Sequence, residues 1–138
     1  MPSEMTVPLW CRVGFVLWVV ILVVALTLAR LRHLARGGSH LEFGIPDDRR
    51  LIWRLFRAHA NAVENLPLFA CVVLVAAVRG VASLVFDLLA VTYLASRIGQ
   101  SVLHVSPGAG LRGHRRFLFF VIQIVCLLGL LLLAVWPE

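Results

Sequence analysis

The sequence contains no lysine, and all 13 of its basic residues are arginine. With only seven acidic residues, the formal net charge is +6, which taken alone could suggest a nucleic-acid partner. The arginines, however, lie beside and inside apolar segments and do not form a soluble basic patch. We therefore expect them to orient the chain in a membrane or to bind anions, with no nucleic acid as partner.

Cysteine is also scarce, and Cys11, Cys71 and Cys126 each lie within or beside an apolar run. We interpret them as small buried hydrophobic residues, not as disulfides, metal ligands or nucleophiles. The sequence has no P-loop, no G-x-G-x-x-G motif and no nucleophile elbow. His59 and His104 could ligate haem, but His59 points off the polar face of its helix, and no metal-ligand spacing is present. We expect no metal site.

Apolar residues dominate what remains: 61% of the 138 residues are hydrophobic, and the mean hydropathy is +0.94. A soluble domain is typically about 45–50% apolar. Several windows reach the roughly 20 apolar residues that cross a bilayer, so the composition predicts an integral membrane protein with a single domain. Short connections favour an all-α, antiparallel four-helix bundle, with spans at about 9–31, 51–78, 81–105 and 115–136.

Arginine is distributed unevenly among the connections between these spans. The second connection has only Arg79 and the tails only Arg12, whereas the first and third, with their flanks, carry Arg30, Arg32, Arg36, Arg49, Arg50, Arg112, Arg115 and Arg116. The positive-inside rule therefore predicts that the first and third connections are cytoplasmic and that both termini lie outside. We expect a bacterial inner membrane, with the first apolar run kept as a span and not removed as a signal peptide.

The residues most informative about function form a polar stripe at the start of the second span. They recur at i, i+4, i+7 and i+11 and so share one helix face: Arg57, Asn61, Glu64 and Leu68. Arg54 continues this face toward the membrane surface. A charge at bilayer depth costs roughly 2.5–3.5 kcal/mol on insertion scales, so it normally faces a protein interior. The stripe predicts a buried polar site; a network that only packs helices together is the alternative.

A second stripe on the third span has the same spacing and consists of Tyr93, Arg97, Gln100 and His104. If the two helices form a hairpin that turns near Gly80, Glu64 is level with Arg97. The same register sets Asn61 level with Gln100, and Arg57 level with His104. Each charge then has an opposite or hydrogen-bonding neighbour, as burial requires. Because the stripes open toward the arginine-rich connections, they predict a pocket for an anionic ligand.

The string RAHANAVENLPL, residues 57–68, resembles the signature of the MAPEG superfamily, the membrane-associated proteins in eicosanoid and glutathione metabolism. Members share an Arg-Ala-(His/Gln)-x-Asn-x-x-Glu-(Asn/Tyr) core followed by a nearby proline, here Pro67. The string falls at the start of the second of four spans, as in the family. The resemblance implies a homotrimer of four-helix subunits, with glutathione as co-substrate bound between neighbouring subunits near the cytoplasmic face.

The resemblance also implies roles for individual residues. By motif position, glutathione would contact Arg57, Asn61 and Glu64. Further candidates for glutathione binding are Arg54, His59, Arg97, Gln100, His104 and one of Arg30 and Arg32. Arg112 is the loose counterpart of an arginine proposed to activate the thiol, and it is the candidate catalytic residue. Gln100 and His104 stand where better-known transferases carry tyrosines, which is a departure from the pattern.

Three functions follow from these features. The first is a glutathione-dependent transferase or peroxidase acting on lipophilic electrophiles or lipid hydroperoxides that enter from the membrane lipid. The second is a non-catalytic membrane protein of the same fold that binds another anionic ligand or has a structural or regulatory role, which the missing tyrosines favour. The third, a small transporter, is weakened because Glu64 lies near one membrane surface and no broken helix or inverted repeat is visible.

Overall fold

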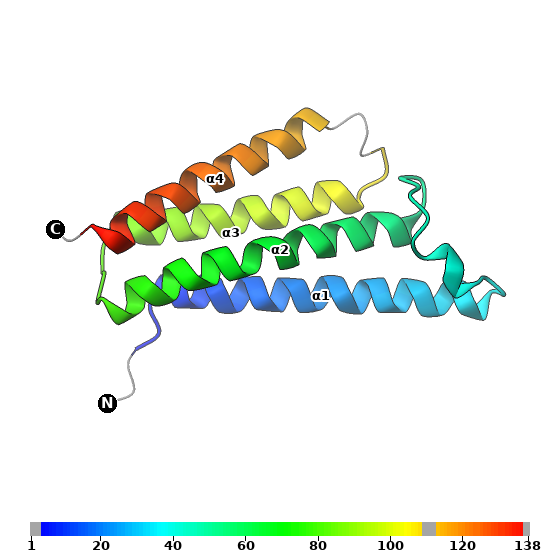
Figure 1. The fold of residues 1–138 in the computed structure, drawn as a ribbon, viewed down its shortest axis with the longest axis horizontal. Coiled ribbons are helices and arrows are strands. Elements are labelled where there is room, and N and C mark those ends of the chain that lie inside the picture. Colours follow the sequence, from blue (N-terminus) through cyan, green and yellow to red (C-terminus); the bar gives the residue numbers. More distant parts are fainter. Residues whose placement is uncertain (1–3, 109–112, 137–138) are drawn as a thin grey trace.

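The computed structural model describes residues 4–108 and 113–136. Within these ranges the chain forms four long helices and no strand (Figure 1). The helices are α1 Val7–Ala35, α2 Leu51–Val78, α3 Leu84–Val105 and α4 Gly113–Val135, and a short 3-10 turn, His40–Glu42, lies between α1 and α2. Successive helices run antiparallel, so the predicted all-α four-helix fold class is confirmed.

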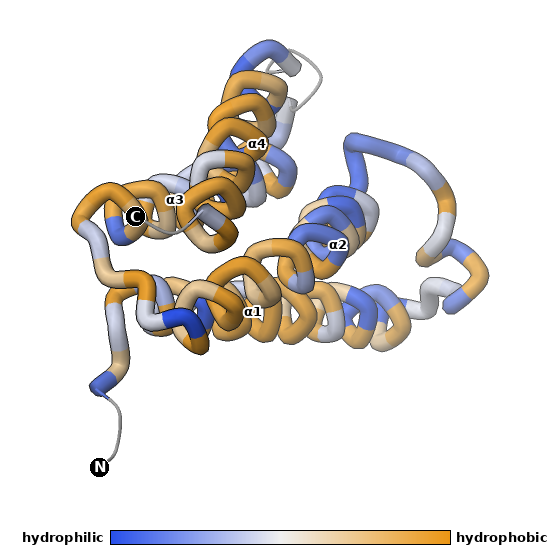
Figure 2. Tube along the Cα trace, turned by 60° about the vertical axis from the view of Figure 1, so that its left-hand side comes forward, coloured by the Kyte–Doolittle hydropathy of each residue, from blue (hydrophilic) through white to orange (hydrophobic). Residues whose placement is uncertain are grey.

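The two ends of the bundle differ in polarity. One end holds the α1–α2 connection, the C-terminal end of α3 and the N-terminal end of α4, and we call it the arginine-rich end (Figure 1). Figure 2 shows hydrophilic residues along the α1–α2 connection and the first turns of α2, while most of the helical length is hydrophobic. The opposite end holds the start of α1, the end of α4 and the α2–α3 turn, where Gly80 has a φ of 69°.

Three of the helices in the described part of the chain, α1, α2 and α4, are long and apolar enough to cross a membrane. The third helix has 22 residues, or about 33 Å of length, but lower hydropathy. Its polar residues are mostly buried in the bundle: Ser96, Arg97, Gln100, Ser101 and His104. The side chains that α3 leaves exposed are mainly aliphatic, and a fourth span at this helix therefore stays our prediction.

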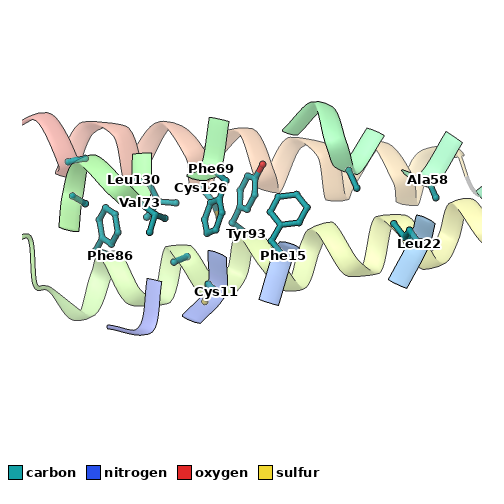
Figure 3. Packing of buried hydrophobic residues seen from close by; sticks show 14 residues of the cluster. Cys11, Phe15, Leu22, Ala58, Phe69, Val73, Phe86, Tyr93, Cys126 and Leu130 are labelled. Carbon is teal, nitrogen blue, oxygen red and sulfur yellow. The ribbon is translucent and has the colours of Figure 1, made fainter. Parts of the chain in front are cut away.

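An aromatic cluster holds three of the helices together at mid-length (Figure 3). The rings of Phe69 on α2 and Tyr93 on α3 stack in parallel, with centroids 4.6 Å apart, and Phe15 on α1 packs 6.0 Å from Phe69. Such pairs add to the hydrophobic gain of burying large side chains. The cluster fixes the depth of α2 against α3, and through Tyr93 it adjoins the polar residues of the second stripe.

The cysteines follow the prediction only in part. All three are free thiols, and Cys11 and Cys126 are buried in the hydrophobic core, as expected. Cys71 is exposed on α2, so the prediction that it is buried is wrong for the single chain. It lies seven residues after Glu64, on a helix face that also carries the exposed Leu68. In the part of the chain that the structure describes, Glu64, Leu68 and Cys71 on this face are all exposed.

Candidate functional site

A shallow pocket of about 300 Å³, wide open to its surroundings, lies at the arginine-rich end between α2, α3 and α4, and we call it the central pocket. Figures 1 and 2 show that the N-terminal half of α4 leans away from α2 and α3 at this end. The residues that line the pocket are Arg57, Asn61, Gln100, His104, Gly113, Arg116, Phe117 and Phe120. Its size falls at the low end of the range typical of small-molecule sites.

Four of the predicted binding residues meet in this pocket. Arg57 and Asn61 come from the stripe on α2, and Gln100 and His104 come from the stripe on α3. The helical spacing explains the meeting, because residues four apart on each helix project from the same face. The structure therefore brings Arg57 and Asn61 of the first stripe to the same pocket as Gln100 and His104 of the second.

A hydrogen-bond network lies directly behind the pocket and joins three helices. Arg97 donates through Nη1 to Asn61 Oδ1 on α2 and to Gln100 Oε1, the latter at 3.0 Å. Gln123 on α4 donates from Nε2 to the same Gln100 oxygen at 3.2 Å. Gln100 in turn donates from Nε2 to the backbone oxygen of Arg116 at 3.2 Å. The network fixes the orientation of the two amides that line the pocket.

Arg97 is almost completely buried, with 1% of its surface exposed, and it lies behind the pocket lining. Its Nε and Nη2 atoms have no hydrogen-bond partner among the described residues, and none of the ion pairs found there includes it. A buried guanidinium without a direct ion pair is unfavourable unless its surroundings compensate the charge, and here the nearest contributions come from the Tyr93 side chain and, at longer range, the Glu64 carboxylate. The network thus leaves a positive charge behind Asn61 and Gln100, beneath the pocket lining.

The predicted pairing of Glu64 with Arg97 is not found. Arg97 is bonded instead to Asn61, about one turn earlier on α2, and Glu64 is exposed on the face that carries Leu68 and Cys71. The α2–α3 turn runs through residues 79–83, and the Phe69–Tyr93 stack confirms that Glu64 lies close to the depth of Arg97, so the pairing fails because Glu64 is on an exposed face and not because the depth differs. An amide oxygen also accepts from Arg97 without bringing a second charge into the core.

Other predicted residues lie outside the central pocket. Arg54 joins the start of α2 to the end of α3, because its Nε donates to the backbone oxygen of Val105 at 2.9 Å. Its Nη1 donates to the backbone oxygen of Asp48 at 3.0 Å. His59 is half-buried on another face of α2. Arg112, the candidate catalytic residue, lies outside the described residues.

The two candidate arginines of α1 are also remote from the pocket. The Arg30 guanidinium lies 5.3 Å from the centre of the Phe43 ring, a cation–π contact. Arg32 lines a separate groove between α1 and α2. One copy of the chain therefore does not bring Arg30 or Arg32 to the same pocket as Arg57.

Several lining residues were missed at the level of sequence, and all come from α4. Arg116 Nη1 lies 3.4 Å from His104 Nδ1, and Phe117 and Phe120 form the apolar side of the pocket. One signal could have found Arg116: it precedes Gln123, the polar interior residue of α4, by seven residues and therefore shares its helix face.

The charge of the pocket suits an anion with an apolar part. Arg57 and Arg116 supply two guanidiniums at the wall. Arg57 is engaged by Asp48 at 3.2 Å, but both side chains are substantially exposed, at 41% and 54%, so this ion pair is weak and exchangeable. Within the described ranges, no group of three or more histidines, cysteines or acids could hold a metal ion.

Together the fold and the pocket define a class: a helical membrane protein with a cationic and partly aromatic pocket at one end of its bundle. A family model gives the more particular assignment, since the model of the MAPEG family matches residues 7–136. The match covers nearly the whole chain, and the protein belongs to the MAPEG family. The comparisons with curated proteins and with solved structures gave no match to the chain.

Proposed function

We propose that this protein is a membrane-bound, glutathione-dependent transferase or peroxidase that acts on lipophilic electrophiles or lipid hydroperoxides. One observation carries the proposal: Arg57 and Arg116 line the same cavity as the rings of Phe117 and Phe120. The pocket therefore offers charge to an anionic peptide and apolar surface to a second, lipophilic reactant. Membership of the MAPEG family, whose members generally use glutathione, supports the same choice.

Glutathione carries two carboxylates, one amine and one thiol. Arginine holds a carboxylate through two parallel hydrogen bonds, so Arg57 and Arg116 each suit one carboxylate. A glutathione carboxylate would take the place of Asp48 beside Arg57, because that exposed ion pair contributes little. Asn61 and Gln100 would complete the polar wall.

The chemical step requires the thiolate, because the neutral thiol is a poor nucleophile. A guanidinium close to the sulfur favours the thiolate; Arg112 is proposed for this role by family position, and Arg116 by its place at the pocket wall. In transfer, the thiolate sulfur forms a bond to the electrophilic carbon while the leaving group departs with its electron pair. In peroxide reduction, the sulfur attacks the O–O bond, an alcohol leaves after protonation, and a second glutathione converts the sulfenic acid to disulfide and water.

The residues outside the central pocket support a proposal about assembly. Glu64 is an exposed carboxylate on α2, a helix apolar enough to cross a membrane, and such a group is costly against lipid. A neighbouring copy that covers this face would remove it from lipid and bring Arg30 or Arg32 of one copy toward the pocket of the next. We therefore propose a homotrimer with glutathione between copies, Glu64 pairing the glutathione amine and the arginine-rich end facing the cytoplasm.

A second function, a non-catalytic anion-binding protein of this fold, rests on Gln100. Both ends of its amide are engaged between helices: Oε1 accepts from Arg97 and Gln123, and Nε2 donates to the Arg116 oxygen. An amide bonded in this way links the helices of the bundle, and it cannot act as a general acid. Under this alternative, the pocket binds an anion without turnover.

Purified protein in detergent separates the two functions. We expect formation of the thioether from glutathione and 1-chloro-2,4-dinitrobenzene, or consumption of cumene hydroperoxide, together with a glutathione-dependent rise in melting temperature, because a ligand that binds only the folded state stabilises it. A rise in melting temperature without turnover of either substrate would establish the non-catalytic alternative. No rise at millimolar glutathione, in protein whose oligomer is intact, would remove glutathione from the proposal.

A further inference from the structure

A second cavity, larger than the central pocket, lies between α1 and α2 at the arginine-rich end. Its volume is about 660 Å³, and we call it the α1–α2 groove. Apolar residues form its floor and sides: Ala25, Leu28, Ala29, Leu51, Ile52, Leu55 and Val105. Ala25 and Ala29 are one turn apart, and their small side chains leave room between the two helices. Leu28 and Leu51, at 49% and 46% exposure, form an open apolar rim.

The basic residues of the groove are Arg32, His33, Arg36 and Arg50. Two of them lie beside one acidic residue, because Glu42 Oε2 is 2.7 Å from His33 Nε2, an ion pair when the imidazole is protonated, and 3.4 Å from Arg50 Nη2. Arg50 also donates from Nη1 to the Glu42 backbone oxygen at 2.9 Å. These contacts place a carboxylate beside His33 and Arg50 at the polar end of the groove.

Arg32 and Arg36 differ from these two residues. They are exposed, one turn apart on α1, and neither takes part in a salt bridge or a side-chain hydrogen bond within the ranges that the structure describes. Cations at the C-terminal end of α1 are favourable to the helix dipole, which is reason enough for one of them to be basic. The helix dipole does not account for the large apolar groove that lies beneath both Arg32 and Arg36.

We propose that the α1–α2 groove binds an anionic phospholipid of the leaflet at the arginine-rich end. Arg32 and Arg36 hold the phosphate, since arginine forks bind phosphate through paired hydrogen bonds. One acyl chain lies over Ala25 and Ala29 and leaves the groove past Leu28 into the bilayer. The charge and the shape of the groove match the two parts of such a lipid, whereas a soluble phosphate would leave the apolar floor unfilled.

The experiment titrates the full chain in a neutral detergent with dioctanoyl phosphatidylglycerol and counts bound lipids by native mass spectrometry. We expect saturable binding at least tenfold tighter than that of dioctanoyl phosphatidylcholine, and at least tenfold weaker binding by the double variant Arg32→Gln, Arg36→Gln. Equal binding of the two lipids would overturn the proposal, because the arginines would then not select charge. Ala29→Phe, which fills the floor and keeps every charge, should weaken binding by a similar factor.

Three controls test whether lipid binding depends on the α1–α2 groove itself. Arg49→Gln removes an exposed charge of the same connection outside the groove and should leave binding unchanged; an equal loss there would reduce the effect to general electrostatics. Glycerol 3-phosphate should not compete with the lipid, and competition at similar concentrations would indicate a soluble phosphate site. Displacement of the lipid by glutathione would assign the groove to the neighbouring copy's glutathione site and would also overturn the proposal. Melting temperatures without lipid confirm that each variant is folded.

Discussion

Arg97 on α3 donates through Nη1 to the side-chain oxygen of Asn61 on α2, and this bond connects the core of the bundle to the wall of the central pocket. Asn61 therefore has two tasks, because it compensates a buried cation and presents its amide to the cavity. Asn65 adds to the arrangement by donating from Nδ2 to the Asn61 side-chain oxygen at 3.3 Å. Stability and ligand binding are thus coupled at one residue.

Two substitutions at Asn61 separate these tasks. Asn61→Ala leaves Arg97 with one acceptor fewer and should lower the free energy of unfolding by about 1–3 kcal/mol. Asn61→Asp keeps the acceptor and adds a counter-ion for Arg97, so its melting temperature should equal or exceed that of the wild type. The same carboxylate repels an anion, and the glutathione-dependent rise in melting temperature should shrink. Thermal unfolding in detergent measures both; equal destabilisation by the two variants would contradict the role given to Arg97.

Arg116 is the residue at the pocket wall that most directly tests the proposed function. Arg116→Gln removes one guanidinium from the cavity and should weaken glutathione binding by roughly 10- to 100-fold, as expected for a charge-assisted hydrogen bond of about 1.5–3 kcal/mol. Arg115→Gln, an exposed neighbour outside the pocket, is the matched control and should bind as the wild type does.

A comparison with Arg112→Gln assigns the thiol-activating arginine. If Arg112 activates the thiol, the absorbance of the bound thiolate and the turnover rate should both fall in Arg112→Gln, while glutathione affinity falls more in Arg116→Gln. If Arg116 activates the thiol, the two variants should show the reverse pattern. If Arg115→Gln lost as much affinity as Arg116→Gln, the cavity would not be the binding site.

The sequence predicts the fold and part of the site for identifiable reasons. The stripes on α2 and α3 repeat with helical spacing, so Arg57, Asn61, Gln100 and His104 could be grouped before any coordinates. The direction in which Glu64 points could not be predicted in the same way. Spacing along one helix shows which residues share a face, but it does not show which neighbouring helix that face contacts. Periodicity puts Glu64 with Asn61, yet the packing of α2 turns only Asn61 inward.

The contribution of α4 escaped prediction for a different reason. Arg116 stands next to Arg115 at the membrane edge, where arginines usually orient the chain, and composition does not distinguish the two. Their separate roles depend on the helix face that meets α3, where Gln100 bonds the Arg116 oxygen at 3.2 Å. Side-chain placement at a helix end is decided by tertiary contacts.

Tyr93 gives a prediction about the core. Its ring stacks on Phe69 at 4.6 Å (Figure 3), and its buried hydroxyl lies beside the Arg97 guanidinium without forming a close hydrogen bond in the described part of the chain. Tyr93→Phe keeps the stack and removes only a hydroxyl that makes no close hydrogen bond, so the free energy of unfolding should change by no more than about 1 kcal/mol. Tyr93→Leu, which removes the stack, should be destabilising. A clear loss of stability in Tyr93→Phe would mean that the hydroxyl has a partner inside the bundle.

At the opposite end of the bundle, Arg79 fastens α4 to the α2–α3 turn. Its Nη1 lies 2.6 Å from the backbone oxygens of Ala134 and Val135, which the last turn of α4 leaves without helical partners. A cation at a helix C-terminus is also favoured by the dipole. Arg79→Gln should therefore cost about 1 kcal/mol and speed amide hydrogen exchange in the last turns of α4.

Arg12→Gln is the control for this change, since Arg12 is half-buried on α1 and its side chain makes no hydrogen bond within the described residues. It removes the same charge without touching a helix end, and exchange in α4 should stay at the wild-type rate. Faster exchange in both variants would trace the effect to net charge. Faster exchange in Arg79→Gln alone would show that one arginine, distant from the central pocket, stabilises the helix that carries Arg116 and the two phenylalanines of that pocket.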